Sequence, residues 1–500
     1  MQPSLNEFRA QVRSVETEGT GENTFIVFKS ILADDLNPQR AYLNLAKPGS
    51  PDAKQSFLLE SATGGEKLDR YSYLGTNPRK IIKTGKNTEY GEVDPLSVLE
   101  TELAKHKLLK NESVAVFSGG AVGYVAYDCI KYFEPKTSRD LKDPLNMPES
   151  VLMLCDTIIA FDNVYQKIQV IHNIHLSNYS DDELESQYNL AVAAIDEVIF
   201  RLKQPQYNVP QKKVVPNDIF ESNFGQEGYE RMVKDIQKHI KLGDVIQCVP
   251  SQRVVHPTDL EPFNVYRQLR SVNPSPYMFF IDFLDFQLIG ASPEVLVKIE
   301  QGRVITHPIA GTVKRGSTVE EDNKLAEQLL NSAKDRAEHV MLVDLARNDI
   351  NRICEPLSSS VDKLMTLERF SHVTHLVSQC SGVLRPEKTR FDAFRSIFPA
   401  GTVSGAPKVR AMQLIGELEG QVRGAYAGAV GVWGYAEDSM STCIALRTMM
   451  QKDGNVYLQA GGGIVFDSDP TDEYYETVNK MNANVRTLKN AEAYYAEKTA

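Results

Sequence analysis

The distribution of apolar and polar residues predicts a chain built largely of short strands joined locally. The apolar runs Val151–Phe161 and Val164–Ile174 flank Asp162-Asn163, a pair typical of a two-residue hairpin turn. Hairpins of this kind form antiparallel sheet, and the strand–helix alternation of a parallel sheet is missing. Further strands are expected at residues 56–62, 68–75, 245–249, 277–283, 287–289, 295–299, 304–307, 427–435, 441–450, 456–460 and 464–466.

Apolar residues spaced about 3.6 positions apart predict the helices. The mixture of locally paired strands and separate helices indicates the α+β class. A polar segment with three prolines, residues 204–217, is typical of a linker, whereas the polar residues 1–40 are expected to lie at the periphery. Helices are expected over residues 181–202, 228–242, 320–349, 335–352 and 389–419.

Composition excludes several classes of protein. The 500 residues suffice for two or more domains, or one large intertwined pair, and the net charge of −11 argues against nucleic-acid binding. No signal peptide is evident, and the longest apolar run, 151–161, is too short to span a membrane. Six cysteines without a Cys-x-x-Cys pair suit free thiols in a reducing compartment, so we expect a cytoplasmic protein without a membrane partner.

Acidic residues mark the predicted helix at 335–352. Its carboxylates lie on or near an element that is otherwise largely apolar, so each needs a basic partner or a metal ion. A second acidic helix begins after Asp469, and its Glu476 is a plausible counterpart of Glu338. Two glutamates on two helices, with waters completing the shell, would suit Mg²⁺; two ordinary salt bridges would explain the same pattern.

Four other features could carry chemistry, and each has a structural alternative. The loop 398–408 departs from a phosphate loop, although its helix entry could still bind an anion or form a plain turn. The glycines at 461–463 could admit a ligand carboxylate or form a sheet corner. Arg447 in an apolar run needs an anion, from the protein or from a substrate. Either His372 or His375 could transfer a proton, or could simply be hydrogen-bonded.

Several blocks of sequence are distinctive when taken together. They are Asp335-Arg-Ala-Glu-His-Val-Met-Leu-Val-Asp-Leu-Ala-Arg-Asn-Asp349, Pro308-Ile-Ala-Gly-Thr312, Gly401-Thr-Val-Ser-Gly-Ala-Pro-Lys408, Leu446-Arg447, Ala460-Gly-Gly-Gly463, Leu58-Leu-Glu-Ser61 and Asn273-Pro-Ser-Pro-Tyr-Met278. Together these blocks resemble the chorismate-utilising enzymes, and most closely the fungal type of anthranilate synthase component I. The resemblance extends from about residue 40 to residue 485.

The resemblance implies two intertwined domains whose antiparallel sheets pack together with helices outside. We expect an N-terminal domain over 1–203, a linker over 204–217 and a chorismate-binding catalytic domain over 218–500. The implied activity is that of a lyase: ammonia adds to C2 of chorismate, the C4 hydroxyl leaves, and pyruvate is eliminated to give anthranilate, the first step of tryptophan biosynthesis.

The resemblance also implies roles for individual residues. Glu338 and Glu476 would hold Mg²⁺, and His375 would give a proton to the departing hydroxyl with Thr402 lining the same pocket. Ala310 stands where aminodeoxychorismate synthases carry a nucleophilic lysine, and Gln247 where isochorismate-forming relatives carry a lysine that activates water; both favour ammonia as the nucleophile. The implied chorismate contacts are Gly311, Thr312, Tyr426, Arg447, Gly461, Gly462 and Gly463.

The amino-terminal blocks resemble a feedback site for L-tryptophan, formed by Ser61, Pro276, Tyr277 and Met278. No cysteine has the Gly-x-Cys-x-Gly setting of a glutaminase, so the resemblance implies a separate glutamine amidotransferase subunit, anthranilate synthase component II, as partner. Two alternatives remain open: an aminodeoxychorismate synthase component I, and a tryptophan-binding regulatory protein that has lost catalysis.

Overall fold

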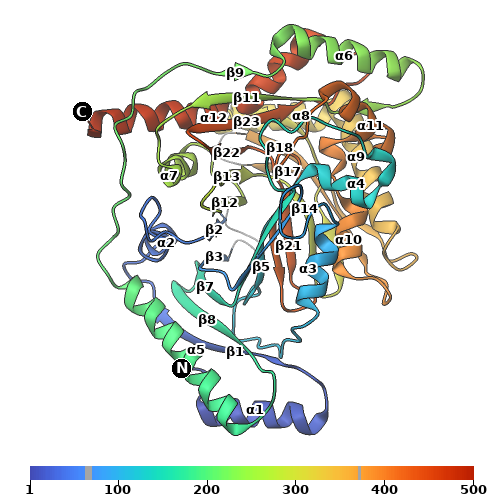
Figure 1. Ribbon diagram of the computed structural model, residues 1–500. Coiled ribbons are helices and arrows are strands. Elements are labelled where there is room, and N and C mark those ends of the chain that lie inside the picture. The colour runs from blue at the N-terminus through green and yellow to red at the C-terminus, as the bar shows by residue number, and fades with distance from the viewer. Residues whose placement is uncertain (62–69, 370–372, 500) are drawn as a thin grey trace.

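Two large antiparallel sheets pack face to face, and helices cover both outer faces (Figure 1). The computed structural model describes residues 1–61, 70–369 and 373–499. The α+β class predicted from sequence is confirmed. The helices are α1 (Leu5–Glu18), α2 (Pro38–Ala46), α3 (Pro95–Leu103), α4 (Ile130–Phe133), α5 (Asp181–Leu202), α6 (Gly225–Lys241), α7 (Pro262–Val272), α8 (Val319–Asn331), α9 (Ala333–Asn351), α10 (Arg390–Ile397), α11 (Lys408–Glu419) and α12 (Pro470–Thr499), with short 3₁₀ turns at η1 (Tyr127–Cys129), η2 (Pro135–Thr137) and η3 (Gly401–Val403).

The first sheet has eleven strands, drawn from both ends of the chain. Strands from the first 175 residues form one side of it, and strands after residue 220 form the other. In spatial order they are β1 (Thr24–Leu32), β8 (Lys167–His175), β7 (Thr157–Asp162), β3 (Tyr71–Thr76), β2 (Ser56–Glu60), β12 (Tyr277–Asp282), β13 (Gln287–Ser292), β22 (Thr448–Lys452), β23 (Asn455–Gly461), β11 (Ser251–Pro257) and β9 (Glu221–Ser222).

The second sheet is also shared between early and late parts of the chain. A separate two-stranded pair, β10 (Gln247–Cys248) with β19 (Gly405–Ala406), lies beside the large sheets. In spatial order the second sheet contains β16 (Ile309–Lys314), β18 (Val373–Val383), β15 (Arg303–Thr306), β14 (Val295–Glu300), β21 (Met440–Ile444), β20 (Ala429–Gly434), β5 (Gly120–Val125), β6 (Ser150–Cys155) and β4 (Lys80–Thr84), with β17 (Ser360–Arg369) paired to β18.

Both faces of the central strands are buried. In β2, Phe57 points toward the second sheet, whereas its neighbour Leu58 points toward the outer helices. Phe279 and Phe280 of β12 divide in the same way. Helices α2, α5, α7 and α12 cover the first sheet, and α3, α9 and α10 cover the second. This two-sided burial explains why the strands appear in the sequence as continuous apolar runs.

Within the described residues, the chain crosses between the two sheets at four places. It does so after β3 through residues 77–79, between β6 and β7 at Asp156, between β13 and β14 at residues 293–294, and between β21 and β22 at residues 445–447. The strand registers place the first two crossings at one end of the strands and the last two at the opposite end. Each sheet therefore takes strands from both sides of residues 204–217, which form neither helix nor strand.

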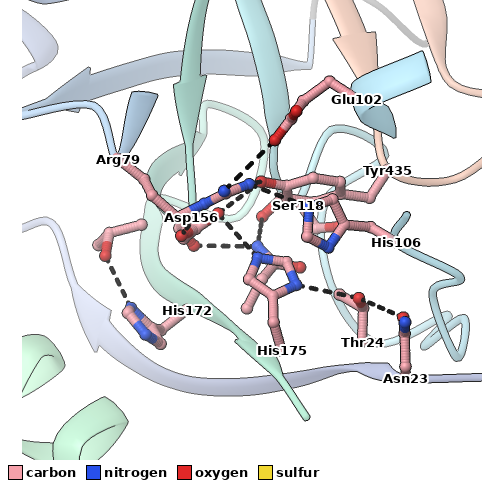
Figure 2. Close-up of polar contacts among 12 residues, drawn as sticks. Asn23, Thr24, Arg79, Glu102, His106, Ser118, Asp156, His172, His175 and Tyr435 are labelled. Atoms are coloured by element: carbon pink, nitrogen blue, oxygen red, sulfur yellow. Dashed lines mark hydrogen bonds and ion pairs between the residues drawn. The ribbon is translucent and has the colours of Figure 1, made fainter. Parts of the chain in front are cut away.

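A partly buried polar cluster joins the sheets at the first two crossings (Figure 2). Arg79 Nε lies 2.9 Å from Asp156 Oδ2, and Tyr435 donates a 2.5 Å hydrogen bond to Asp156 Oδ1. His175 Nε2 lies 3.0 Å from the same oxygen, and Arg79 Nη2 donates to His106 Nε2 at 3.1 Å. Because these side chains satisfy one another, this end of the sandwich is closed by charge pairing.

Several elements differ from those predicted by the sequence. Residues 1–40 are not peripheral, since they form α1, β1 and part of α2 and bury Phe8 and Phe25 in the core. The run 151–161 is two strands in different sheets, and so is 441–450. The predicted two-residue turn is instead the four-residue loop 163–166.

Two short segments also differ. The strand expected at 464–466 is only an isolated bridge between Cys248 and Ile464. The strand expected at 245–249 is only the two-residue β10.

A buried histidine anchors the far end of α12. His256 of β11 is fully buried, with Nδ1 2.8 Å from the Ile219 carbonyl and Nε2 2.9 Å from Glu492 Oε1 on α12. Burial favours the neutral ring, but the bonds to Glu492 and to Ile219 outweigh it and raise the pKa of His256. Both partners accept hydrogen bonds, so an imidazolium with two N–H groups satisfies the site.

We predict that this interaction makes stability depend on pH. Because the folded pKa of His256 exceeds its unfolded value, its contribution is complete below about pH 6.5 and declines as pH rises through the folded pKa. His256→Gln should therefore lower the unfolding temperature more at pH 6 than at pH 9, measured by calorimetry. An equal decrease at both pH values would contradict this account.

Candidate active site

Three glutamates from two helices face one another at the open end of the sandwich. Glu338 lies on α9, and Glu473 and Glu476 lie on the first turns of α12. Burial raises the pKa of Glu338, and its charge interacts with Lys480 and with Glu476. Glu476 is 49% exposed and pairs with Lys480 at 2.6 Å, while Lys480 also donates to the Gly461 carbonyl at 2.9 Å. The two predicted metal-binding residues, Glu338 and Glu476, are therefore neighbours beside an opening to solvent, which we call the mouth of the site.

Two polar atoms beside these glutamates have no partner. Gln247 donates Nε2 to Glu338 at 3.0 Å, but its Oε1 is buried without a hydrogen bond among the described residues. Glu473 accepts from Ser468 through Oε1, and its Oε2 is equally unpaired. Buried oxygens without donors are rare in folded proteins, so this pair of atoms marks a place where a cation or an ordered water would bind.

The glycines at 461–463 allow the backbone to approach this mouth closely. A Cβ on Gly461 would lie 2.5 Å from the Pro250 carbonyl, one on Gly462 would lie 2.9 Å from Glu473 Oε2, and one on Gly463 would lie 2.6 Å from Gln247 Nε2. A side chain at 461 would clash with backbone, and one at 462 or 463 would displace Glu473 or Gln247, so the glycines keep the backbone close to these two side chains.

Arg447 lies at the fourth crossing, with a positive φ of 50°. Its guanidinium has no hydrogen bond or ion pair within the described part of the chain, although the charges of Tyr426, Glu476 and Glu294 lie near it. Burial lowers the pKa of Arg447 and raises that of Tyr426 to about 12. A half-buried cation without a hydrogen bond or ion pair among the described residues is suited to a ligand carboxylate.

The predicted histidine is neutral in this setting. His375 of β18 is buried, and its Nδ1 lies 2.9 Å from Thr312 Oγ1 of β16. Burial, and then the nearby Arg447, lower the pKa of His375 to about 4. Gly311, which adopts a φ of 79°, forms the bulge that brings Thr312 opposite His375. His375 therefore lies beside Thr312 and near Arg447, two of the predicted substrate contacts, as a neutral imidazole at pH 7.

A second proton-carrying group, Glu294, went unnoticed in the sequence. It lies at the third crossing, is 5% exposed, and accepts a 2.9 Å hydrogen bond from Thr402 Oγ1. Burial raises the pKa of Glu294 to about 8, although the Thr402 bond and Arg447 oppose the shift. The carboxyl is protonated at neutral pH and lies among the predicted substrate contacts. The sequence signal was a glutamate after a proline between two apolar strands.

Three other predictions from the sequence concern the loop at 398–408, His372 and the effector residues. Lys408 pairs with the buried Asp349 at 2.5 Å, so the loop at 398–408 has its own internal counterion. His372 lies outside the described residues. The four predicted effector residues, Ser61, Pro276, Tyr277 and Met278, line one cavity between the sheets, together with Val430 and Cys443.

That cavity is connected to the mouth through the second sheet. Val430 lies on β20, four residues after Tyr426, and Cys443 lies on β21, four residues before Arg447. The same two strands therefore form one wall of the cavity and adjoin the loops that hold two of the predicted substrate contacts, Tyr426 before β20 and Arg447 after β21.

A half-buried arginine beside Tyr426 and Glu476, at one end of two sheets shared by both halves of the chain, is the arrangement expected where an enzyme binds an anionic ligand. A sequence model of the family described as chorismate binding enzyme matches residues 54–486, and the chain belongs to that family. Among the described residues, no group of three His, Cys, Asp or Glu side chains is ready to hold a metal, and no helix has the length and apolarity to cross a bilayer.

The chain is also similar to individual proteins of this kind. The chain is 60% identical to anthranilate synthase component 1 of Saccharomyces cerevisiae, over 99% of this chain and 98% of that protein. It is 56% identical to the probable anthranilate synthase component 1 of Schizosaccharomyces pombe, over 95% of each. The crystal structure of anthranilate synthase component I from Streptococcus pneumoniae aligns with a TM-score of 0.75 at 38% identity, covering 91% of this chain and 99% of that one.

We predict that Glu294 lowers stability at neutral pH. Between its ordinary pKa of 4.5 and its raised value of about 8, the folded carboxyl keeps a proton that the unfolded chain loses, so stability falls as pH rises through that window. Glu294→Gln removes this penalty. Its unfolding temperature relative to the parent chain should rise from about pH 5 to about pH 8, measured by calorimetry. A difference that does not change with pH would contradict the buried, protonated state.

Proposed function

We propose that this chain is the chorismate-aminating subunit of an anthranilate synthase, a lyase that converts chorismate and ammonia to anthranilate and pyruvate. The observation that carries the proposal is the Arg447 guanidinium, which has no hydrogen bond or ion pair among the described residues and lies near Tyr426, Glu294 and Glu476 of α12. The names of the relatives at 60% and 56% identity support the same reaction.

Chorismate has two carboxylates, and the pocket offers two places for them. Arg447 and Tyr426 bind the enolpyruvyl carboxylate, because a buried arginine without a partner gains most from a bidentate anion. The backbone of Gly461, Gly462 and Gly463 lies beside the ring carboxylate, whose approach a side chain there would block. The substrate is thereby held with its ring between the third and fourth crossings.

Glu294 is the group best suited to protonate the C4 hydroxyl, which then leaves as water while ammonia forms its bond to C2. Its carboxyl holds a proton at pH 7, whereas His375 is neutral with a pKa of about 4. Thr402 fixes the orientation of Glu294, and Thr312 fixes that of His375. His375 then acts as an orienting hydrogen-bond partner in the pocket.

The glutamates fit a hard divalent cation. Glu338 and Glu476 supply carboxylate oxygens, and the unpaired oxygens of Gln247 and Glu473 are suited to waters around the ion. Two protein carboxylates with waters and a substrate carboxylate are a common arrangement for Mg²⁺. A bound Mg²⁺ supplies Lewis-acid polarisation of the ring carboxylate. Without the ion, Lys480 neutralises Glu476.

Ammonia comes from a separate glutamine amidotransferase subunit. All six cysteines of this chain are buried, and none has the glycine-flanked setting of a glutaminase nucleophile. The designation of the relatives as component 1 implies a partner component. The inter-sheet cavity at Ser61 and Met278 is the binding site that we assign to tryptophan, acting as a feedback inhibitor of a cytoplasmic enzyme.

The two rival functions are less well supported. An aminodeoxychorismate synthase of the lysine-dependent kind needs a nucleophile where this chain has the buried Ala310. A regulatory protein without catalysis has no use for a free Arg447 or for converging glutamates. Mass measurement of the product separates the first rival, and absence of any product at high ammonium separates the second.

We predict that Glu338→Gln and Glu476→Gln each reduce Mg²⁺-dependent formation of anthranilate by about 100-fold or more, since Lewis-acid stabilisation of several kcal/mol is lost. Product fluorescence measures turnover, and calorimetry measures the affinities for Mg²⁺ and tryptophan. Tryptophan affinity should stay within about twofold, because the effector cavity is a separate site.

The matched control is Asp344→Asn. Asp344 also lies on α9, but its side chain is 80% exposed and approaches only Arg347, at 3.6 Å. This variant should keep both turnover and metal affinity. Joint loss of turnover and tryptophan binding in the glutamate variants would instead assign Glu338 and Glu476 to support of the fold.

We predict that the purified chain makes anthranilate from chorismate with ammonium salts but not with glutamine. Addition of the glutaminase subunit should restore the reaction with glutamine. The measurement is anthranilate fluorescence with each nitrogen source, in the presence and absence of the partner. Turnover with glutamine by the chain alone would exclude the two-subunit arrangement.

A further inference from the structure

A buried ion pair lies outside the proposed substrate pocket, where three segments that form its walls meet. These segments contain Thr402, Tyr426 and the glycines at 461–463. Glu419 is the last residue of α11, and Arg423 follows four residues later. Their side chains are 4% and 1% exposed. The contact is bidentate, with Arg423 Nη2 2.6 Å from Glu419 Oε1 and Nε 3.0 Å from Oε2. Neither residue belongs to the set that binds substrate or metal in the proposed function.

Arg423 uses its remaining donors on two backbone segments. Its Nη1 donates to the Val403 carbonyl at 2.9 Å, directly after Thr402. Its Nη2 also donates to the Val249 carbonyl at 2.7 Å. The guanidinium lies over the ring of Tyr127 at 4.5 Å and near the ring of Tyr426 at 5.7 Å. One planar group thus contacts the Thr402 turn, the segment between β10 and β11, and the Tyr426 ring.

Glu419 holds strand β11, which pairs with the strand that leads into the pocket glycines. Its Oε1 accepts from Ser251 N at 2.8 Å and from Ser251 Oγ at 2.9 Å. Ser251 lies opposite Gly461 in the β11–β23 ladder, and the neighbouring Pro250 carbonyl accepts from Gly462 N at 3.3 Å. The carboxylate therefore fixes the strand against which two of the pocket glycines are held.

We propose that Glu419 and Arg423 form a positioning pair that sets the relative alignment of Thr402, Tyr426 and the glycines at 461–463. The inference rests on the proposed function, since these groups are its substrate contacts. A buried ion pair adds little net stability compared with apolar residues of the same volume. The fixed fork of a guanidinium, however, can satisfy a carboxylate and two carbonyls at once, and an ammonium cannot match that geometry.

The test is Arg423→Lys, which keeps the positive charge but removes the planar guanidinium that contacts a carboxylate and two carbonyls at once. We expect kcat for chorismate consumption to fall at least about tenfold, because a shift of about 1 Å in catalytic groups costs roughly 100-fold. KM for chorismate should change less than about threefold, since the carboxylate-binding Arg447 is intact. Glu419→Gln should act in the same direction, and the double variant should be no worse than the more damaged single variant.

Arg253→Lys is the matched control. Arg253 is also a buried arginine on β11, but its contacts are Gln421 Oε1 at 2.8 Å and the Val422 carbonyl at 3.5 Å. It shares β11 with Ser251, but no hydrogen bond or ring contact among the described residues joins its guanidinium to Val249, Val403 or Tyr426, so kcat should remain within about twofold of the parent chain. Tryptophan affinity and unfolding temperature, measured for every variant, report on the fold.

Two results would overturn the inference. One is a kcat for Arg423→Lys equal to that of Arg253→Lys. The other is a loss of kcat that is accompanied by a matching loss of tryptophan binding and of unfolding temperature, which would assign the pair to the fold alone. If Arg423→Lys does not fold, Glu419→Gln alone decides by the same two measurements.

Chorismate consumption and anthranilate release are measured separately in the parent chain and in each variant. Consumption of chorismate without anthranilate would contradict the proposed function. The ratio of consumption rates between Arg423→Lys and the control would still decide the positioning role, so the two failures are distinguishable.

Discussion

Burial of both faces of the central strands is the constraint on which the rest of the structure depends. A charge on a strand covered on one side by helices and on the other by the opposite sheet needs a partner or an opening to solvent. The crossings between the sheets provide such places at both ends of the sandwich. Arg79, Asp156, Glu294 and Arg447 all occupy such places. The architecture concentrates ionisable groups at the two ends of the sandwich, where they lie close together in surroundings of low polarity.

The two ends differ in how their charges are matched. At the first, Arg79 and Asp156 pair directly and are joined by Tyr435, so the end is satisfied within the protein. At the second, Arg447 lacks a partner among the described residues and Glu294 keeps its proton. The second end therefore has a positive charge that can bind an anion and a carboxyl group that can donate a proton. A substrate with two negative charges can use both. Only this end borders the glutamates of α9 and α12.

Much of the fold could be predicted from the sequence, because local signals were strong where they existed. The Asp181–Leu202 helix was predicted with its observed bounds, and the 335–352 helix nearly so. Periodicity could not separate β6 from β7, or β21 from β22, since each pair forms one apolar run in which a single polar residue marks the crossing. For the same reason Glu294 looked like an ordinary turn residue. Its raised pKa arises from burial by distant segments, which only the folded chain reveals.

Because both sheets combine early and late strands, the order of synthesis affects how the chain folds. Strand β5 has β20 as one neighbour, and β2 has β12, so each pairs across a long stretch of sequence. A chain emerging from the ribosome must hold β4, β5 and β6 with an open edge until residues 429–434 have been synthesised. Such late partners make folding slow and leave strand edges open to wrong pairing. The first half of this polypeptide is therefore a poor independent folding unit, and its synthesis calls for chaperone protection until the second half arrives.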